Sequence, residues 1–120
     1  MLARRAIEPN IGMLDLPGGF VEPNETAEEA VIREIREELQ VRITEMSYLV
    51  SFPNEYVYSG LTVFTLDLAF ICKINDCDEI VPGDDISDVE FVDPRTIEMN
   101  ALCSDSMRKI ISHYLSKYYK

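Results

Sequence analysis

The sequence predicts an α/β fold, a three-layered α/β/α sandwich in which a mixed β-sheet lies between helices. The prediction rests on an amphipathic acidic segment over residues 27–39, two apolar strand-like segments over 42–52 and 61–74, and a second amphipathic segment over 106–118. Elements of both kinds along one chain bury their apolar faces most simply in such layers. A chain of 120 residues suits one hydrophobic core, so we expect a single domain over residues 1–120.

A helix is predicted over residues 27–39. Thr26 stands three residues before Glu29, which is the spacing of a capping box, in which each side chain satisfies a backbone N–H group of the other residue. No glycine or proline interrupts the segment. At about 100° per residue, the apolar side chains fall on one stripe that must face a core: Val31, Ile32, Ile35 and Leu39.

Three carboxylates form a cluster beside this apolar stripe. Glu34, Glu37 and Glu38 are spaced at i, i+3 and i+4, so they lie together on one side of the helix. Like charges at this spacing repel each other, and a bound cation would relieve the repulsion. Ligation by oxygen alone favours Mg²⁺ or Mn²⁺ over Zn²⁺. The alternative is a helix whose acidic side is simply solvated, and the spacing alone leaves both interpretations open.

The segment around this helix resembles the Nudix box. That signature specifies nine positions over 23 residues, and eight of them match here: Gly19, Glu25, Arg33, Glu34, Ile35, Glu37, Glu38 and Val41. The flanking Leu16-Pro17-Gly18 and Phe20-Val21-Glu22 are similar to the family as well. Gln40 stands where glycine is usual, and a glutamine in the left-handed conformation expected there costs about 1 kcal/mol.

The resemblance implies a division of roles among these residues. The metal ion, Mg²⁺ with Mn²⁺ as an alternative, would be held by the Gly19 carbonyl and by the three helix carboxylates, Glu34, Glu37 and Glu38. Arg33 would pair with Glu25, which fixes the loop against the helix and orients Glu34 for catalysis. The alternative for this pair is an ordinary surface ion pair.

Glu90 is a further candidate catalytic residue. It lies in a predicted short strand over residues 88–92, and Glu90-Phe91-Val92 resembles the Glu-x-aromatic-apolar segment of the family. The resemblance implies that Glu90 is a fourth carboxylate, acting as a metal ligand or as the general base. A strand residue that faces solvent is the alternative.

Residues 1–17 are expected to contain two short strands joined by a loop. Members of the family normally carry one or two strands before the segment that corresponds to Arg4-Arg5-Ala6, so we expect those N-terminal strands to be missing here. A missing strand exposes a sheet edge, which favours a homodimer. Arg4 or Arg5 is a candidate ligand for a substrate phosphate. The alternative is that both are solvated charges that protect the edge from aggregation.

Two strands are predicted after the box, over residues 42–52 and 61–74. Pro53 is expected to end the first strand, and the two strands would pair as an antiparallel hairpin across the loop 53–60. Apolar residues on both faces of 61–74 mark this segment as a central strand.

This region also resembles a bacterial subgroup of the family, the ADP-ribose or NADH pyrophosphatases, through Ser51-Phe52-Pro53-Asn54-Glu55-Tyr56 and Thr65-Leu66-Asp67. In the family, side chains from this region line the nucleoside side of the cleft. Tyr56 and Tyr58 are therefore candidates for stacking on a base or ribose, with packing inside the protein as the alternative.

The rest of the chain predicts a loop and two helical segments. The acidic run within 75–85 is expected to be a solvated surface. Pro94 is expected to open a brief helix that ends near Met99. A cap at Ser104 or Asp105 is expected to start the amphipathic helix over 106–118.

Composition narrows the range of partners and compartments. A net charge of −11 argues against nucleic acids and anionic membranes as partners. No apolar run approaches the roughly 20 residues of a membrane span, and no signal-peptide pattern is present at the N-terminus. Cysteines at 72, 77 and 103 are odd in number and lack C-x-x-C spacing, so we expect reduced thiols in the cytoplasm.

The predicted activity is Mg²⁺-dependent hydrolysis of the pyrophosphate linkage in a nucleoside diphosphate joined to another moiety. ADP-ribose, NADH and nucleoside triphosphates are all candidate substrates, with ADP-ribose preferred. The alternative is a catalytically silent Nudix-like domain that senses a ligand or regulates a partner. The complete set of helix carboxylates argues against this alternative, because a domain that only binds does not need them.

Overall fold

The computed structural model describes residues 1–6, 11–75 and 77–119, and of Tyr58 the backbone alone. Its elements follow each other in the order β1 (Leu2–Arg5), β2 (Leu14–Asp15), α1 (Ala27–Leu39), β3 (Ile43–Tyr58), β4 (Leu61–Ile74), β5 (Ile86–Glu90), the 3₁₀ turns η1 (Pro94–Thr96) and η2 (Met99–Ala101), and α2 (Asp105–Tyr118).

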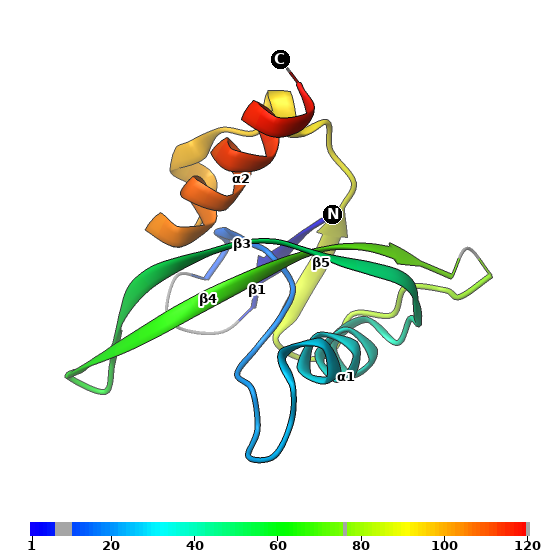
Figure 1. Cartoon of the computed structure of the whole chain (residues 1–120), viewed down its shortest axis with the longest axis horizontal. Helices are drawn as coiled ribbons and strands as arrows, with labels where there is room; N and C mark the ends of the chain where they lie inside the picture. Colours follow the sequence, from blue (N-terminus) through cyan, green and yellow to red (C-terminus); the bar gives the residue numbers. More distant parts are fainter. Residues whose placement is uncertain (7–10, 76, 120) are drawn as a thin grey trace.

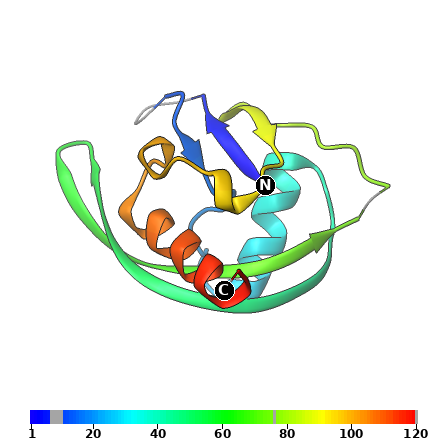
Figure 2. The ribbon, with the colours of Figure 1, turned by 90° about the horizontal axis from the view of Figure 1, so that it is seen from above.

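The strands form a middle layer between the two helices. In Figure 1, α2 lies above the strands and α1 lies below them. Figure 2 shows the molecule from above, with the long β3–β4 hairpin curving along one side and β1, β2 and β5 on the other. The predicted α/β class and its layers are confirmed. Among the described residues, no helix is long and apolar enough to cross a membrane.

The single mixed sheet predicted from the sequence is corrected to two antiparallel sheets. One has the strand order β2-β1-β5, and the other consists of β3 and β4. The described strands of one sheet form no backbone ladder with those of the other. Among the residues that the structure describes, parallel pairing is confined to an isolated bridge between Leu14 and Leu102.

Helix α1 begins and ends as the sequence predicts. The Thr26 hydroxyl accepts a hydrogen bond from the Glu29 N–H at 3.1 Å, and the Glu29 carboxylate accepts one from the Thr26 N–H at 3.0 Å. The helix ends with Gln40 in the left-handed conformation, at φ 60° and ψ 32°. Carbonyls of the last turn accept N–H groups from the loop before β5, including a 2.7 Å bond from Gly83 to Glu38.

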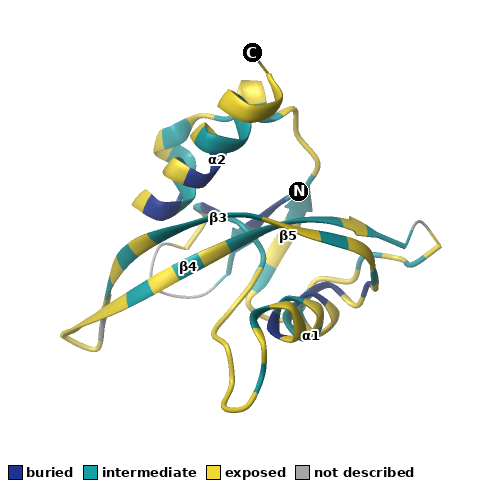
Figure 3. Cartoon of the chain, in the orientation of Figure 1, coloured by how far each residue is buried: buried dark blue, intermediate teal, exposed yellow. Residues whose placement is uncertain are grey.

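Each helix packs against its own apolar cluster. On one side, Leu39 and Val41 are fully buried with Ile35 and apolar residues of β3, β4 and β5. On the other side, α2 packs over Leu2 and Leu14, and Ser104 caps its first turn. Figure 3 shows buried residues on both helices. Side chains alternate along a strand, so neighbouring residues face opposite sides of the sheet. Leu2 of β1 therefore packs in the α2 cluster, whereas Met1, directly before it, packs in the α1 cluster.

The hairpin differs from the prediction in two respects. Pro53 does not end the strand: β3 continues to Tyr58, and the hairpin turns at Ser59 and Gly60, which both have the positive φ of a tight two-residue turn. A proline is tolerated there because β3 is an edge strand, bonded within the described residues to β4 alone.

Within the described residues β4 is bonded to β3 alone, so it is not the central strand that the sequence predicts. Phe64 on β4 is 75% exposed. The predicted short strand lies slightly earlier, as β5, and the brief helix after Pro94 is divided into η1 and η2.

Candidate active site

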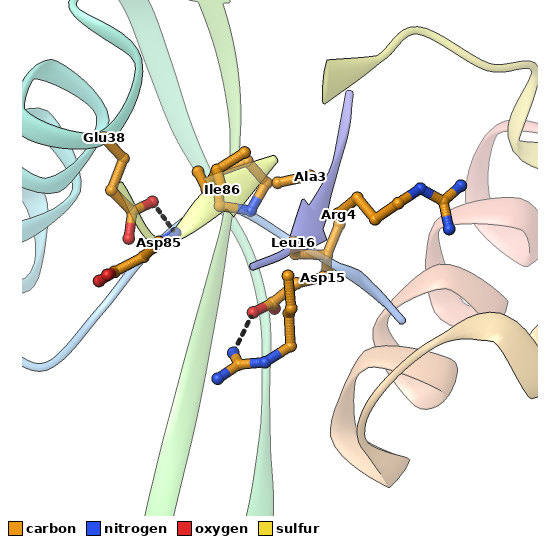
Figure 4. Close-up of a pocket in the computed structure, with 10 residues that line it drawn as sticks. Ala3, Arg4, Asp15, Leu16, Glu38, Asp85 and Ile86 are labelled. Carbon is orange, nitrogen blue, oxygen red and sulfur yellow. Dashed lines mark hydrogen bonds and ion pairs between the residues drawn. The ribbon is translucent and has the colours of Figure 1, made fainter. Parts of the chain in front are cut away.

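A cavity of about 90 Å³ lies between β1, the segment that follows β2, the last turn of α1 and the start of β5. Figure 4 shows the residues around it. They combine two guanidinium groups, three carboxylates and exposed main chain: Ala3, Arg4, Arg5, Asp15, Leu16, Pro17, Gly18, Glu38, Asp85 and Ile86. The cavity therefore brings the Gly-Gly turn of the Nudix-like segment next to the last carboxylate of its helix.

Glu38 is the carboxylate of α1 that lines this cavity. Its Oε2 accepts a hydrogen bond of 3.2 Å from the Gly18 N–H (Figure 4). Burial and the neighbouring charge of Glu34 raise the pKa of Glu38 to about 7, and Asp15 and Asp85 act in the same direction. Without a cation nearby, Glu38 is thus only partly ionised at neutral pH.

Glu34 lies one turn earlier on α1, and its carboxylate rests directly on Gly19. A Cβ atom added at Gly19 would lie 2.4 Å from Cδ of Glu34, far inside normal contact distance. Gly19 is therefore required for the close approach of the loop to the helix carboxylate. The other side of the Glu34 carboxylate is held by the Arg33 guanidinium, with Nη1 2.8 Å from Oε1.

The predicted pair between Arg33 and Glu25 is present. Arg33 donates from Nε and Nη2 to the two carboxylate oxygens of Glu25, at 2.7 and 3.0 Å, and also from Nη2 to the Phe20 carbonyl at 3.1 Å. The Arg33 guanidinium holds the pKa of Glu25 at about 2. One side chain thus joins the loop that follows Gly19 to helix α1.

Glu37 lies further from the cavity, with 60% of its side chain exposed and Oε2 3.2 Å from Nη1 of Arg33. The three helix carboxylates do not converge on one point here: within the part of the chain that the structure describes, no three His, Cys, Asp or Glu residues are arranged to hold a metal ion. The donors nevertheless fit Mg²⁺ in kind, since all are oxygens. The repulsion by Glu34 that raises the pKa of Glu38 is also what a bound cation would relieve.

The two arginines of β1 have different surroundings. Arg5 lies in the cavity wall, and its Nη1 is 2.9 Å from Oδ2 of Asp15. The Arg4 side chain points away from Glu38 (Figure 4) and donates to the Gly12 carbonyl at 2.7 Å and to Glu90 at 3.1 Å. Of the two, Arg5 is therefore the better placed for a ligand in the cavity.

Glu90 is not brought together with the helix carboxylates. In the ladder between β1 and β5 it lies opposite Leu2, so the two side chains share the face of the sheet that is turned towards α2. Glu90 lines a second cavity on that face, with Leu2, Leu14 and residues of η1 and η2.

Tyr56, one of the two candidate tyrosines, does not line the cavity. The Tyr56 hydroxyl donates to Oδ2 of Asp67 at 3.1 Å, and burial raises the pKa of Tyr56. The Tyr58 side chain lies outside the described part of the structure. For Tyr56, the contacts support packing inside the protein.

Asp15, Asp85 and Gly18 line the cavity but were not identified from the sequence as site residues. Asp85 belongs to the acidic run expected to be solvated, and it reaches the cavity because the nearby Gly83 N–H is bonded to the Glu38 carbonyl. Asp15 directly precedes the Leu16-Pro17-Gly18 turn, and this position is the signal that identifies it.

Comparison with known proteins identifies the family. A model of the NUDIX domain matches residues 1–114. An ADP-ribose pyrophosphatase of Methanocaldococcus jannaschii is 36% identical over 96% of this chain and 64% of its own length. An NAD-capped RNA hydrolase NudC of Pseudomonas syringae pv. tomato is 33% identical over 90% of this chain and 35% of its own length. The chain thus spans less than two thirds of the curated relatives it matches.

Solved structures support the same assignment. A MutT/nudix family protein from Enterococcus faecalis superposes with a TM-score of 0.70 at 26% identity, over 96% of this chain and 53% of its own. The MutT protein from Methanosarcina mazei Go1 shares the fold with a TM-score of 0.73 at 21% identity, over 99% of this chain and 84% of its own. The chain belongs to the NUDIX domain family.

Proposed function

We propose that this chain hydrolyses the pyrophosphate linkage of a nucleoside diphosphate derivative, with ADP-ribose as the preferred substrate and Mg²⁺ as the cofactor. The observation that carries the proposal is the contact between Gly19 and the Glu34 carboxylate, beside a cavity that Glu38 lines. The similarity to an ADP-ribose pyrophosphatase supports the choice of substrate.

The residues that would hold Mg²⁺, or Mn²⁺ in its place, are Glu34, Glu37, Glu38 and the Gly19 carbonyl. When bound, such an ion activates water and neutralises the charge that develops on phosphoryl oxygens. The net charge of −11 is consistent with this requirement, because a polyanionic substrate needs cations to approach an acidic protein.

The remaining groups of the site position the reactants. Arg33 holds the loop after Gly19 through Glu25 and the Phe20 carbonyl, and it holds Glu34 directly, so it fixes the distance between loop and helix. Arg5 lies on the opposite wall, where its guanidinium can donate to a phosphate oxygen in place of Asp15.

The experiment is a panel of ADP-ribose, NADH, a diadenosine polyphosphate and nucleoside triphosphates, incubated with Mg²⁺ or with EDTA. We expect cleavage of ADP-ribose to AMP and ribose 5-phosphate in Mg²⁺ and none in EDTA. Preferred cleavage of another member would replace the substrate but keep the chemistry, and cleavage that EDTA does not affect would contradict the metal requirement.

A ligand-sensing domain without turnover is the second candidate. It is favoured by the ion pairs of Arg33 with both Glu34 and Glu37, because these occupy two of the carboxylates that the reaction would need. Such a domain would bind ADP-ribose in a calorimeter and cleave no member of the panel.

In either case we place the protein in the cytoplasm, because its three cysteines are free thiols.

A further inference from the structure

Asp15 and Arg5 form an ion pair in the wall of the cavity. Nη1 of Arg5 lies 2.9 Å from Oδ2 of Asp15, and this bond is the dashed line beside Asp15 in Figure 4. Asp15 lies opposite Ala3 in the ladder between β1 and β2, so its side chain shares one face of the sheet with Ala3 and Arg5. Because the ladder fixes both backbones, a change of partner requires only rotation of side chains.

This ion pair stabilises the Asp15 carboxylate only weakly. Burial raises the pKa of Asp15 above its ordinary value of 3.8, and the Arg5 guanidinium does not offset this effect. Arg33 shows the opposite balance, since its two hydrogen bonds to Glu25 lower the pKa of that carboxyl to about 2. The pair of Arg33 with Glu25 is therefore a fixed part of the site, whereas the pair of Arg5 with Asp15 can be exchanged at a small cost in free energy.

Asp15 also has donors that do not depend on Arg5. The Leu16 N–H and the Cys103 thiol lie beside its carboxylate, and both act to lower its pKa. The backbone holds Cys103 in this place, because its N–H donates to the Leu14 carbonyl at 2.9 Å. Asp15 therefore keeps polar partners when the guanidinium turns towards another anion.

A phosphoryl group that enters the cavity depends on Arg5. Three carboxylates line the cavity. The other guanidinium in its wall, that of Arg4, is bound to the Gly12 carbonyl and to Glu90. A guanidinium uses the same donors for a carboxylate and for a phosphate, and two anions close together repel each other. A phosphoryl group must therefore take the guanidinium of Arg5 from Asp15.

We propose that Asp15 is the resident anion of a phosphate subsite, which pairs with Arg5 until a phosphoryl group of the ligand replaces it. The competition between the two anions then sets the affinity of the cavity for phosphorylated ligands. This inference rests on the proposed function, in which Arg5 donates to a phosphate oxygen. Asp15 is accordingly a residue that determines affinity and not a catalytic residue.

Calorimetric titration of ADP-ribose in EDTA measures this competition without the metal-dependent reaction. Asp15→Asn keeps the size of the side chain and removes its charge, so we expect the dissociation constant to fall about 10-fold, the low end of the effect of one neighbouring charge on an ionic equilibrium. The double variant with Arg5→Gln should bind no more tightly than the wild type, because the gain acts through Arg5. Asp88→Asn is the matched control: it removes an aspartate that lies 3.5 Å from Arg4 and does not line the cavity, so binding should stay close to that of the wild type.

Circular dichroism establishes that each variant is folded, and Asp15→Ser is a second replacement that removes the charge. Unchanged or weaker binding by folded Asp15 variants would overturn the proposal, and weaker binding would show that Asp15 positions Arg5 for the ligand. The full gain in the double variant, or the same gain in Asp88→Asn, would overturn it as well, because each indicates a general effect of charge. Absence of binding by both the wild type and Asp15→Asn would also count against it, because removal of the competing anion should make Arg5 available.

The proposed hydrolase activity has a separate readout. A wild-type protein that cleaves no member of the substrate panel in Mg²⁺, together with tighter binding by Asp15→Asn, would refute the hydrolysis and support the phosphate subsite. Mg²⁺-dependent cleavage without tighter binding by Asp15→Asn would refute the role of Asp15 alone.

Discussion

Replacement of Gly19 by alanine is the sharpest test of how the loop meets helix α1. The added Cβ would lie 2.4 Å from Cδ of Glu34 and 2.5 and 2.6 Å from its two oxygens. Ordinary contact begins at 3.4 Å, so the carboxylate must move by about 1 Å. The crowded atoms are the end of a flexible side chain, so we expect the fold to accept the change.

The expected effect is on catalysis. A displacement of about 1 Å at a catalytic group can lower the rate by about 10²-fold. We therefore predict that Gly19→Ala lowers kcat for ADP-ribose by about 10²-fold and leaves the melting temperature close to that of the wild type. The assay is AMP release under saturating Mg²⁺, with thermal unfolding measured on the same samples.

Gly83→Ala is the matched control. Its added Cβ would meet its nearest neighbour, the Glu38 carbonyl oxygen, at 3.5 Å, which is ordinary contact. The alanine also keeps the N–H group that donates to that carbonyl at 2.7 Å. Wild-type turnover in Gly19→Ala would refute the reasoning, and so would an equal loss in both variants or unfolding of Gly19→Ala alone.

Three further predictions concern the stability of the helix and its loop. Leu39 is fully buried, so Leu39→Ala should lower the free energy of unfolding by about 2–5 kcal/mol in urea denaturation, and a loss below 1 kcal/mol would contradict its place in the core. Gln40 has φ 60°, so Gln40→Gly should raise the free energy of unfolding by about 1 kcal/mol, whereas a destabilised variant would show that the left-handed cap is wrong. The pKa of Glu25 falls from 4.5 to about 2 on folding, so its contribution to stability is complete above pH 4.5 and is lost as the pH falls towards 2. Urea denaturation between these pH values should show a weaker pH dependence for Glu25→Gln, and an unchanged slope would contradict the pairing with Arg33.

Local features of the sequence predict α1 and its surroundings well. The Thr26–Glu29 capping box, the left-handed end at Gln40 and the pair of Arg33 with Glu25 are all present in the structure. Each depends on side chains close in sequence or on one compact segment. The geometry of the capping box follows from helix spacing, whereas the left-handed end at Gln40 and the Arg33–Glu25 pair are implied by the resemblance to the Nudix box.

Features set by strand pairing could not be predicted in the same way. Pro53 is compatible with a strand only at an edge, and β4 is a central strand only if another strand lies beside it. Glu90 points towards α2 because of its register with Leu2, and Asp85 reaches the cavity through a loop bonded to the end of α1. These positions depend on contacts between distant segments, which composition and periodicity do not reveal.

The most direct test of the proposed activity compares ADP-ribose turnover by the wild type, Glu34→Gln and Glu38→Gln in Mg²⁺, with circular dichroism as the check on folding. Glutamine keeps the size of each side chain and removes the charge that a cation needs. We predict Mg²⁺-dependent turnover by the wild type and a loss in each variant greater than the roughly 10–100-fold caused by removal of an outer partner of a metal ligand. Folded variants that both turn over ADP-ribose at the wild-type rate would contradict the assignment of these carboxylates to the reaction.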